Sequence, residues 1–389
     1  NQNKVLSSNM KKVETSTKIT LLLIAMLGVM SNTAIVTSLP HLGEHFKNVS
    51  NIELLSRLMI TLPSLVIAML APFLGHFVHR TSIITNAIFA LILFAIAGSA
   101  GLYLNNIESL LISRMFLGLA IAIIMIVGTT LTGFYFHGKA RDKFMGLQSA
   151  FISVGGVLFI SGGGILSDIA WRYPFGIYLI GFLVLPMIVL FLKEPSSLSE
   201  LEDDRELPDK VHFIYILAFI LMLIFYVLPT QMPFLMINHF GASGTLAGFI
   251  ISTAMASNAL GAISFSKFKK HFGFADIWFI GLIILAIGFT AIGNITNVYF
   301  FFFTSPIMGF GGGLLMTATM AWMLEIVHHS RRTKASGYLT GAFFAGQFAS
   351  PIVFHPIISY FGLQHFFIIL GVSILITSSS FVLYKKVKN

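Results

Sequence analysis

The sequence predicts an all-α membrane protein in which twelve transmembrane helices form two six-helix bundles. Of its 389 residues, 56% are hydrophobic and only 10% are charged, and long apolar stretches follow one another along the whole chain. Crossing the hydrocarbon core of a bilayer takes about 20 mostly apolar residues in a helix. We therefore expect twelve spans, at residues 18–42, 54–78, 83–104, 107–136, 145–170, 173–193, 212–238, 242–265, 277–296, 298–327, 336–360 and 364–384.

The first expected span is too long for a signal peptide and eleven more follow it, so we expect it to be retained. The chain has no cysteine. This excludes disulfides, thiolate metal sites and a cysteine nucleophile. The sequence also contains no zinc-protease motif, no Walker loop and no serine-hydrolase motif. We therefore expect neither an enzyme, nor a metal site, nor a cofactor.

The basic residues indicate which side of the membrane each loop occupies. If the N-terminus lies inside the cell, all Lys and Arg fall in cytoplasmic segments except Lys47, Arg57, Arg114 and Arg172. Cytoplasmic loops of membrane proteins carry such an excess of basic residues, so both termini are expected in the cytoplasm. The net charge of +9 then reflects topology and contact with anionic lipid rather than a nucleic-acid partner.

One polar stretch divides the chain into halves. It is acidic, contains Pro195 and Pro208, and has six expected spans on either side. We expect an N-terminal bundle of residues 1–193, a cytoplasmic linker of residues 194–211 and a C-terminal bundle of residues 212–389. The halves repeat at a separation of 191 residues, which pairs Gly118 with Gly309, Arg141 with Arg332, Lys143 with Lys334, Gly146 with Gly337, Gly155 with Gly346 and Phe175 with Phe366. Such a repeat predicts a substrate site near the midplane between the bundles.

Short motifs in the first half resemble one family. The loop after the second span contains Gly75 and Arg80, with His79 where the family has an aspartate, and the fourth span contains Arg114 and Gly118. The fifth span carries a glycine-rich run followed by Trp-Arg, although Phe-Ile stands in place of the family's Gly-Pro pair; its glycines are Gly155, Gly156, Gly162, Gly163 and Gly164. On these residues, and over essentially its whole length, the chain resembles the major facilitator superfamily, and most of all its bacterial twelve-helix drug:proton antiporters.

The resemblance implies the major facilitator fold and a secondary active transporter in the bacterial cytoplasmic (inner) membrane. It implies a monomer that exports a small amphipathic compound, of the multidrug-resistance type, by proton-coupled antiport and alternating access. An exporter of a specific metabolite, such as a siderophore, sugar or amino-acid derivative, stays open, because no carboxylate stands at the middle of spans 1, 4, 7 or 10. A non-transporting membrane receptor is a third alternative.

The candidates for coupling transport to protons are Arg114, Asp168, His355 and Glu325. Arg114 is expected about 10 Å inside its span, and an arginine within a span is costly and is usually functional or paired. We expect it to bias a proton carrier or contact substrate, with a structural arginine that ties helices together as the alternative. Asp168 is either a helix-end partner of Arg172 or a titrating group near Arg114.

The other charged groups near span ends have local interpretations. We expect Glu325 to pair with the basic loop Arg331–Lys334. His355 either titrates near physiological pH or is a hydrogen-bonded structural group. We expect Arg57, near the outer end of the second span, to anchor that helix at the membrane interface with its head group in water, with a role in the outer gate as the alternative.

Polar, aromatic and methionine side chains inside the spans are candidates for lining a substrate cavity, because they suit a pliable and mostly apolar pocket. Each has packing between helices as its alternative. The candidates are Asn32, Thr129, Thr130, Phe225, Tyr226, Gln231, Met316, Thr317, Met320, Trp322 and Gln347. We expect the glycine runs to allow close helix packing, and His79 to cap a neighbouring helix or to sense pH.

Overall fold

The computed structural model describes residues 13–136, 138–194, 207–328 and 331–388, and within these ranges it contains helices and no strands. The first half comprises α2 (Thr15–Thr33), η1 (Val36–Ser38), α3 (Leu39–His45), α4 (Ile52–Arg80), α5 (Ile83–Gly98), η2 (Ser99–Leu102), α6 (Ile107–Tyr135), α7 (Gly138–Ile169), η3 (Tyr173–Leu179) and α8 (Ile180–Phe191). The second half comprises α9 (Lys210–Phe225), α10 (Val227–Phe234), η4 (Leu235–His239), α11 (Gly244–Lys269), α12 (Phe274–Gly293), η5 (Val298–Phe300), α13 (Phe301–Ile326), α14 (Arg332–Phe361) and α15 (Leu363–Lys388).

The helices have the length and composition of membrane spans. In the described residues, ten helical segments are long and apolar enough to cross a bilayer, and two further apolar helices are shorter, Thr15–Gly28 and Leu363–Ser378. Every one of the twelve expected spans coincides with helical structure. The protein is therefore an all-helical, multi-pass membrane protein, and a total of twelve spans stays a prediction.

Polar residues fix where several helices begin. Ser82, Asn106 and Ser243 each accept a hydrogen bond from the backbone amide three residues later, as N-cap residues do. The carboxylate of Glu194 adds a second cap to α5, because it accepts hydrogen bonds from the amides of Ile83 (2.7 Å) and Ile84 (3.1 Å). The residue that follows the first half is thereby attached to the start of the third expected span.

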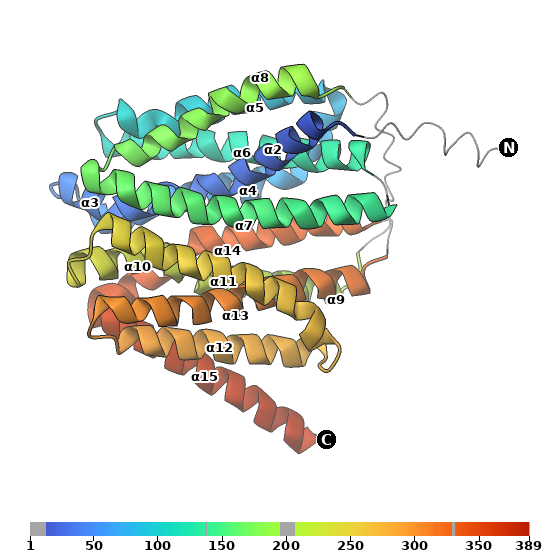
Figure 1. Cartoon of the computed structure of the whole chain (residues 1–389). Helices are drawn as coiled ribbons and strands as arrows, with labels where there is room; N and C mark the ends of the chain where they lie inside the picture. Colours follow the sequence, from blue (N-terminus) through green and yellow to red (C-terminus); the bar gives the residue numbers. More distant parts are fainter. Residues whose placement is uncertain (1–12, 137, 195–206, 329–330, 389) are drawn as a thin grey trace.

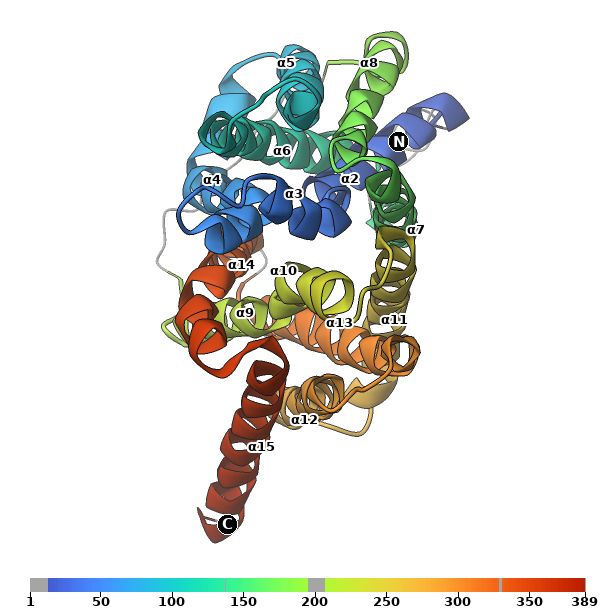
Figure 2. The same cartoon turned by 90° about the vertical axis from the view of Figure 1, so that its left-hand side faces the viewer.

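The two halves lie side by side along most of their length. Figure 1 shows the helices running along a common direction, and Figure 2 shows the first-half helices on one side of the molecule and the second-half helices on the other. Where the halves meet, α4 packs on α14 and α7 packs on α11, with α3 and α10 facing each other between these pairs. The interface therefore consists of two helix pairs that flank a central region.

Glycines allow the close approach of α7 to its neighbours. A Cβ atom on Gly163 would collide with the carbonyl oxygen of Ala34, and one on Gly164 would collide with the carbonyl oxygen of Gly244 in the other half. Gly162 has open space around it, so the close contact depends on its two successors. Only glycine permits backbone contacts this short between helices.

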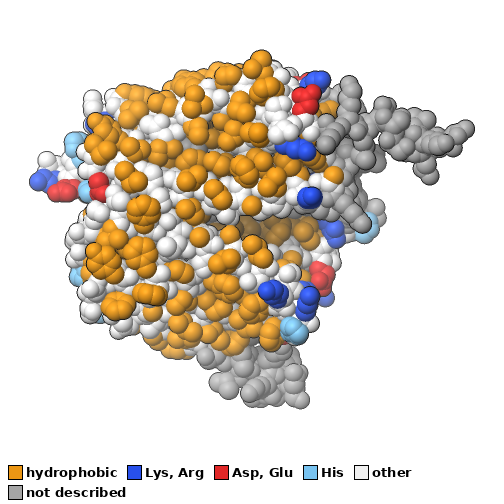
Figure 3. All heavy atoms as spheres, viewed as in Figure 1, with side chains coloured by type: hydrophobic (Ala, Val, Ile, Leu, Met, Phe, Trp, Pro, Cys, Tyr) orange, Lys and Arg blue, Asp and Glu red, His pale blue; other side chains and the backbone are white. Residues whose placement is uncertain are grey.

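The two ends of the molecule differ in charge. We call one end the basic end, because Lys and Arg collect there; described members are Arg141, Lys143, Lys193, Lys210, Lys267, Lys269, Lys270, Arg332 and Lys334. The opposite end, which holds the first turn of α4 and of α11 and the last turn of α7 and of α14, is called the far end. Figure 3 shows a surface covered by hydrophobic side chains between the ends, and a hollow between the halves toward the basic end.

Candidate functional site

Two helices are interrupted at the centre of the interface, one in each half. The first expected span ends its α2 segment at Thr33 and resumes as η1 and α3, and the seventh changes from α9 to α10 at Tyr226. Pro40 lies at the start of α3, and Pro229 and Pro233 follow the second break. Proline lacks a backbone N–H and crowds the preceding turn, so it favours such interruptions. Discontinuous helices at corresponding places in two repeats are typical of substrate sites in transporters.

Polar side chains from both halves meet beside these breaks. Gln347 of α14 accepts hydrogen bonds from Ser64 of α4 (2.9 Å) and from Asn32 of α2 (3.4 Å), while its amide group contacts the sulfur of Met222 (3.8 Å). The buried hydroxyl of Tyr226 lies against the side chain of Asn32, and neither this hydroxyl nor the buried Oδ1 atom of Asn32 has another hydrogen-bond partner among the described residues. We call Asn32, Ser64, Tyr226 and Gln347 the central polar cluster. It combines hydrogen bonds between the halves with unused hydrogen-bonding capacity.

Arg57 connects the halves closer to the far end. Its side chain is 3% exposed, and its Nε atom donates a hydrogen bond to Oε1 of Gln231 in α10 at 2.7 Å. The guanidinium lies over the ring of Phe234, 4.3 Å from its centroid, and also bonds the carbonyl of Glu53. We expected the Arg57 head group to lie in water, whereas it is buried against the other half. Both partners from the second half, Gln231 and Phe234, belong to α10. The sequence alone does not place α10 beside α4.

Asp168 makes the second polar connection at the far end. Its carboxylate accepts hydrogen bonds from the backbone amides of Gly244 (2.5 Å) and Thr245 (2.8 Å) and from the Thr245 hydroxyl (2.5 Å). A carboxylate at a helix N-terminus is stabilised by the free amides and by the helix dipole. Neither expected partner is in contact with it, because Arg172 instead bonds the carbonyls of Gly101 and Leu104. Asp168 therefore joins α7 to α11 of the other half.

Arg114 lies inside the first half, away from these connections. Its side chain is fully buried, and its Nη2 atom donates to the carbonyls of Ala97 and Gly98 at the end of α5, both at 2.7 Å. Its guanidinium lies 5.1 Å from the ring centroid of Phe175 and 5.3 Å from that of Tyr178. These contacts tie α5, α6 and the segment before α8 together, as in the structural alternative for this arginine.

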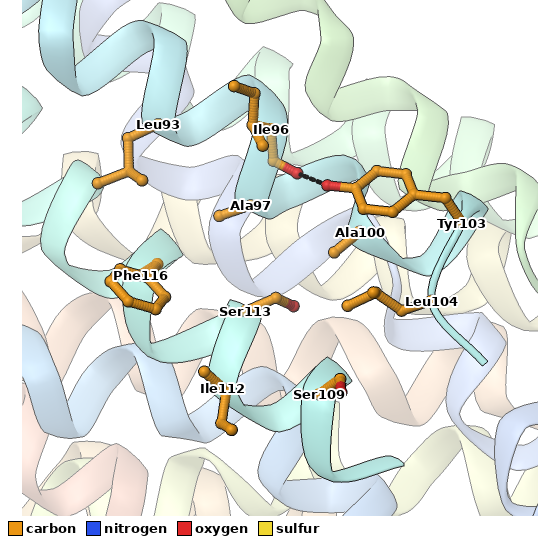
Figure 4. A pocket seen from close by; sticks show the side chains of 10 residues that line it. All are labelled: Leu93, Ile96, Ala97, Ala100, Tyr103, Leu104, Ser109, Ile112, Ser113 and Phe116. Atoms are coloured by element: carbon orange, nitrogen blue, oxygen red, sulfur yellow. Dashed lines mark hydrogen bonds between the residues drawn. The ribbon is translucent and has the colours of Figure 1, made fainter. Parts of the chain in front are cut away.

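An apolar pocket of about 340 Å³ lies near Arg114, between α5, η2 and α6 (Figure 4). Its lining includes the exposed side chains of Ile96, Ile112 and Phe116, and the Tyr103 hydroxyl crosses it to bond the Ile96 carbonyl at 2.5 Å. All ten lining residues come from the first half. The pocket is therefore separate from the interface that holds the central polar cluster.

The two remaining coupling candidates lie near opposite ends. His355 is half-buried and lines a polar pocket of about 360 Å³ at the far end, together with Asn51 and Glu53 of the first half. Glu325 forms an ion pair with Lys269 of α11 at 3.9 Å, rather than with the loop Arg331–Lys334, and its side chain is exposed. α11 and α13 pack against each other, and Lys269 and Glu325 both lie in the last turns of these helices.

The other cavity candidates vary in their surroundings. Thr129 is exposed, and its hydroxyl bonds carbonyls of its own helix, as does that of Thr317. Phe225 packs on Gly312, and Trp322 stacks on Phe274 toward the basic end. The remaining candidates are half-buried: Thr130, Met316 and Met320. Ser64 and Arg57 are not among the predicted cavity residues. Their contacts with the side-chain amides of Gln347 and Gln231 leave no pattern in the neighbouring sequence that would predict them.

The motif residues of the first half are only partly described. The side chains of His79 and Arg80, and the surroundings of Gly75, lie outside the described residues. Gly118 packs against the backbone of Pro63, and Gly155 packs against Met26; these contacts join α6 to α4 and α7 to α2. Gly156 is also buried.

The comparison with protein families agrees with this architecture. The model of the Major Facilitator Superfamily matches residues 21–212 and 214–388, which is nearly the whole chain in two consecutive stretches. The chain belongs to the major facilitator superfamily. It is therefore a membrane transporter and not an enzyme.

Individual proteins with a similar sequence match only part of the chain, and at low identity. Multidrug resistance protein 1 of Bacillus subtilis (strain 168) is 28% identical over 216 residues, which are 52% of this chain and 55% of that protein. Multidrug resistance protein 2 of the same organism is 25% identical over 125 residues, 32% of this chain and 31% of the relative. These matches thus span about a third to a half of each relative.

Solved structures share the fold over nearly the whole chain. The crystal structure of a bacterial homolog to the human lysosomal transporter Spinster, in an inward-facing and unoccupied conformation, superposes with a TM-score of 0.79. The superposition covers 95% of this chain and 96% of that one, at 17% sequence identity. At this identity the likeness concerns the fold alone.

Proposed function

We propose that this major facilitator protein exports a small amphipathic compound across the bacterial cytoplasmic membrane by alternating access, in exchange for protons. The two moving units are the bundles of residues 1–193 and 212–389, joined by the linker 194–211. One observation carries the proposal. Between described residues, the hydrogen bonds that join the halves run from the central polar cluster to the far end, while the surface is hollowed toward the basic end.

The distribution of charge supports the direction of this opening. Basic residues collect on the cytoplasmic side of membrane proteins. The basic end is then cytoplasmic, both termini lie inside the cell, and the hollow faces the cytoplasm. The compound would enter from the cytoplasm, bind near the central polar cluster and leave at the far end once the connections of Arg57 and Asp168 break. The partial similarity to two multidrug resistance proteins supports export as the direction.

The hydrogen bonds at the far end are weak enough to break during a transport cycle. A hydrogen bond to a charged group contributes about 1.5–3 kcal/mol. Arg57 makes one such bond to the second half, and Asp168 makes three. Conformational equilibria of transporters involve a few kcal/mol, so loss of either group would change the population of the two states substantially.

The same connections are candidate sites for protons. Asp168 is exposed at the far end, and adding a proton would remove the charge that its three donors stabilise. His41 of α3 interacts electrostatically with Asp168, His355 lines a pocket together with Glu53, and Glu53 lies 3.7 Å from Arg57. Protonation from outside would favour opening toward the outside, which is the step in which an antiporter exchanges its solute for a proton.

Dye and drug efflux tests this function. Cells that express the chain should export at least one amphipathic compound, and an uncoupler should stop the export. The matched control is Arg57→Ala protein at equal abundance, which should export less. If a broad panel contains no compound whose export depends on the proton gradient, the antiport proposal fails. If counterflow in proteoliposomes is also absent for every compound, the transporter role of this chain fails with it.

A further inference from the structure

We propose that the central polar cluster binds an uncharged hydroxyl or amide group of the solute, so that the transported compound is a neutral amphipath rather than a lipophilic cation. The inference rests on the proposed function, since it assumes that the solute binds between the halves. It concerns the chemical class of the solute, which neither the family nor the relatives determine.

The cluster keeps part of its hydrogen-bonding capacity free. Gln347 Oε1 accepts hydrogen bonds from Ser64 and from Asn32, so its acceptor capacity is used. The Tyr226 hydroxyl lies against the Asn32 side chain, and neither it nor the acceptor Asn32 Oδ1 has another partner among the described residues, although a hydroxyl can both donate and accept. Buried polar atoms without partners cost about 1–3 kcal/mol each, so a ligand that supplies the missing partners gains that free energy.

These atoms lie beside the interruptions of the first and seventh spans. Asn32 stands in the last turn before the break of the first span, and Tyr226 stands at the break of the seventh. Asn32 and Gln347 are half-buried rather than sealed in the interface. Helix breaks expose backbone and side-chain polar groups at mid-membrane depth, which is tolerated only next to protein or a cavity. The unused atoms of the two halves therefore face a common region.

Among the described residues, no carboxylate stands at the cluster as a counter-ion for a cation. The carboxylate side chains that the structure describes within helices occur in terminal turns: Glu44, Glu53, Glu108, Asp168, Asp276 and Glu325. The charged side chain buried between the halves is Arg57, which is positive. A cation moved from water to this site would lose hydration without a carboxylate partner, at a cost that hydrogen bonds to neutral groups do not offset. An uncharged group avoids this cost.

The surroundings complete the amphipathic character of the site. Met222 contacts the amide of Gln347, and Phe225 adjoins Tyr226 and packs on Gly312 of α13. Methionine and aromatic side chains adapt to apolar groups of varied shape. A compound with an apolar body and one or two hydroxyl or amide groups would satisfy both features. The competing role for the cluster is to hold the halves together without touching solute.

Binding to purified protein separates these roles. The probes are chloramphenicol, a neutral amphipath with hydroxyl and amide groups, and the tetraphenylphosphonium cation. We expect calorimetry to detect chloramphenicol binding, with affinity reduced about tenfold in Asn32→Ala and in Tyr226→Phe. Thr377→Val is the matched control, because that exposed hydroxyl bonds only its own helix and lies on α15. Tetraphenylphosphonium should bind at least tenfold more weakly than chloramphenicol.

A charge exchange tests the inference in the opposite direction. Asn32→Asp introduces a carboxylate at the cluster with little change in shape, and it should raise tetraphenylphosphonium affinity while lowering that for chloramphenicol. Thermal unfolding of each variant, compared with that of the Thr377→Val control, shows whether it is folded. Wild-type protein that binds the cation more tightly than the neutral probe would overturn the inference. So would folded Asn32→Ala and Tyr226→Phe proteins that bind chloramphenicol normally.

Transport assays distinguish this inference from the proposed function. If the protein exports cations with a proton gradient and rejects neutral probes, the solute class is wrong and the export function stands. If chloramphenicol binds in a cluster-dependent way but no compound is moved, the export function fails while the binding site stands.

Discussion

Arg57 and Arg114 are both buried, yet they do opposite things in the molecule. Arg57 is 3% exposed and bonds Gln231 in the other half, whereas Arg114 is 0% exposed and bonds carbonyls of its own half. A contact within one bundle persists when the bundles move relative to each other. In the proposed alternating-access cycle, a contact between the bundles must break each time the far end opens. Burial alone therefore does not distinguish a structural arginine from one that controls conformation; its partner does.

The largest expected effect is on Arg114→Ala. This change removes two hydrogen bonds from a charged donor and leaves the carbonyls of Ala97 and Gly98 without that partner. We expect a loss of stability of about 3 kcal/mol or more, seen as a large fall in the thermal unfolding temperature in detergent. Arg114→Lys should recover part of it, because lysine lacks the planar guanidinium. A stable Arg114→Ala protein without transport would instead favour a coupling role.

Arg57→Ala should leave the fold intact and change the conformational equilibrium. We expect the open far-end state to gain about 2 kcal/mol, roughly a thirtyfold change in population. Because the chain has no cysteine, labelling of a single Thr37→Cys reports on this interface, where Thr37 is 1% exposed. Labelling should accelerate in the Arg57→Ala background and remain slow in wild type. Equal labelling with normal transport would remove Arg57 from the gate.

Asp168→Asn should have a smaller effect of the same kind. Asparagine keeps one oxygen acceptor but loses the charge that the amides of Gly244 and Thr245 stabilise. We expect a change of about 1 kcal/mol in favour of the open far end. Lowering the pH on the side of the membrane at the far end should speed Thr37→Cys labelling in otherwise wild-type protein. It should have less effect when Asp168→Asn is also present. An undiminished acid response would assign it to His41 or His355 instead.

Glu325→Gln should have the smallest effect. Its ion pair with Lys269 is long, at 3.9 Å, and exposed, so it contributes less than about 0.5 kcal/mol. Stability and transport rate should match wild type within error. A clear loss of proton-driven transport with unchanged stability would make Glu325, at the basic end, a coupling group in place of those proposed at the far end.

The helices and their order along the chain follow from the sequence alone. Apolar stretches of about 20 residues predict helices because the backbone must satisfy its own hydrogen bonds in a bilayer. Each expected span coincides with helical structure, and the family follows from motifs such as that of Arg114 and Gly118. The absence of a carboxylate from the middle of the spans is likewise visible without coordinates.

Only the tertiary structure decided which polar residues meet. Arg57 and Gln231 are 174 positions apart, and Asn32 and Gln347 are 315 apart. Asp168 bonds the start of α11 rather than its near neighbour Arg172. Hydropathy and local motifs describe each helix separately, whereas these contacts depend on how α4, α7, α10 and α14 are rotated and paired. A polar side chain inside a span carries the same local signal whether it faces its own bundle, the other bundle or a cavity.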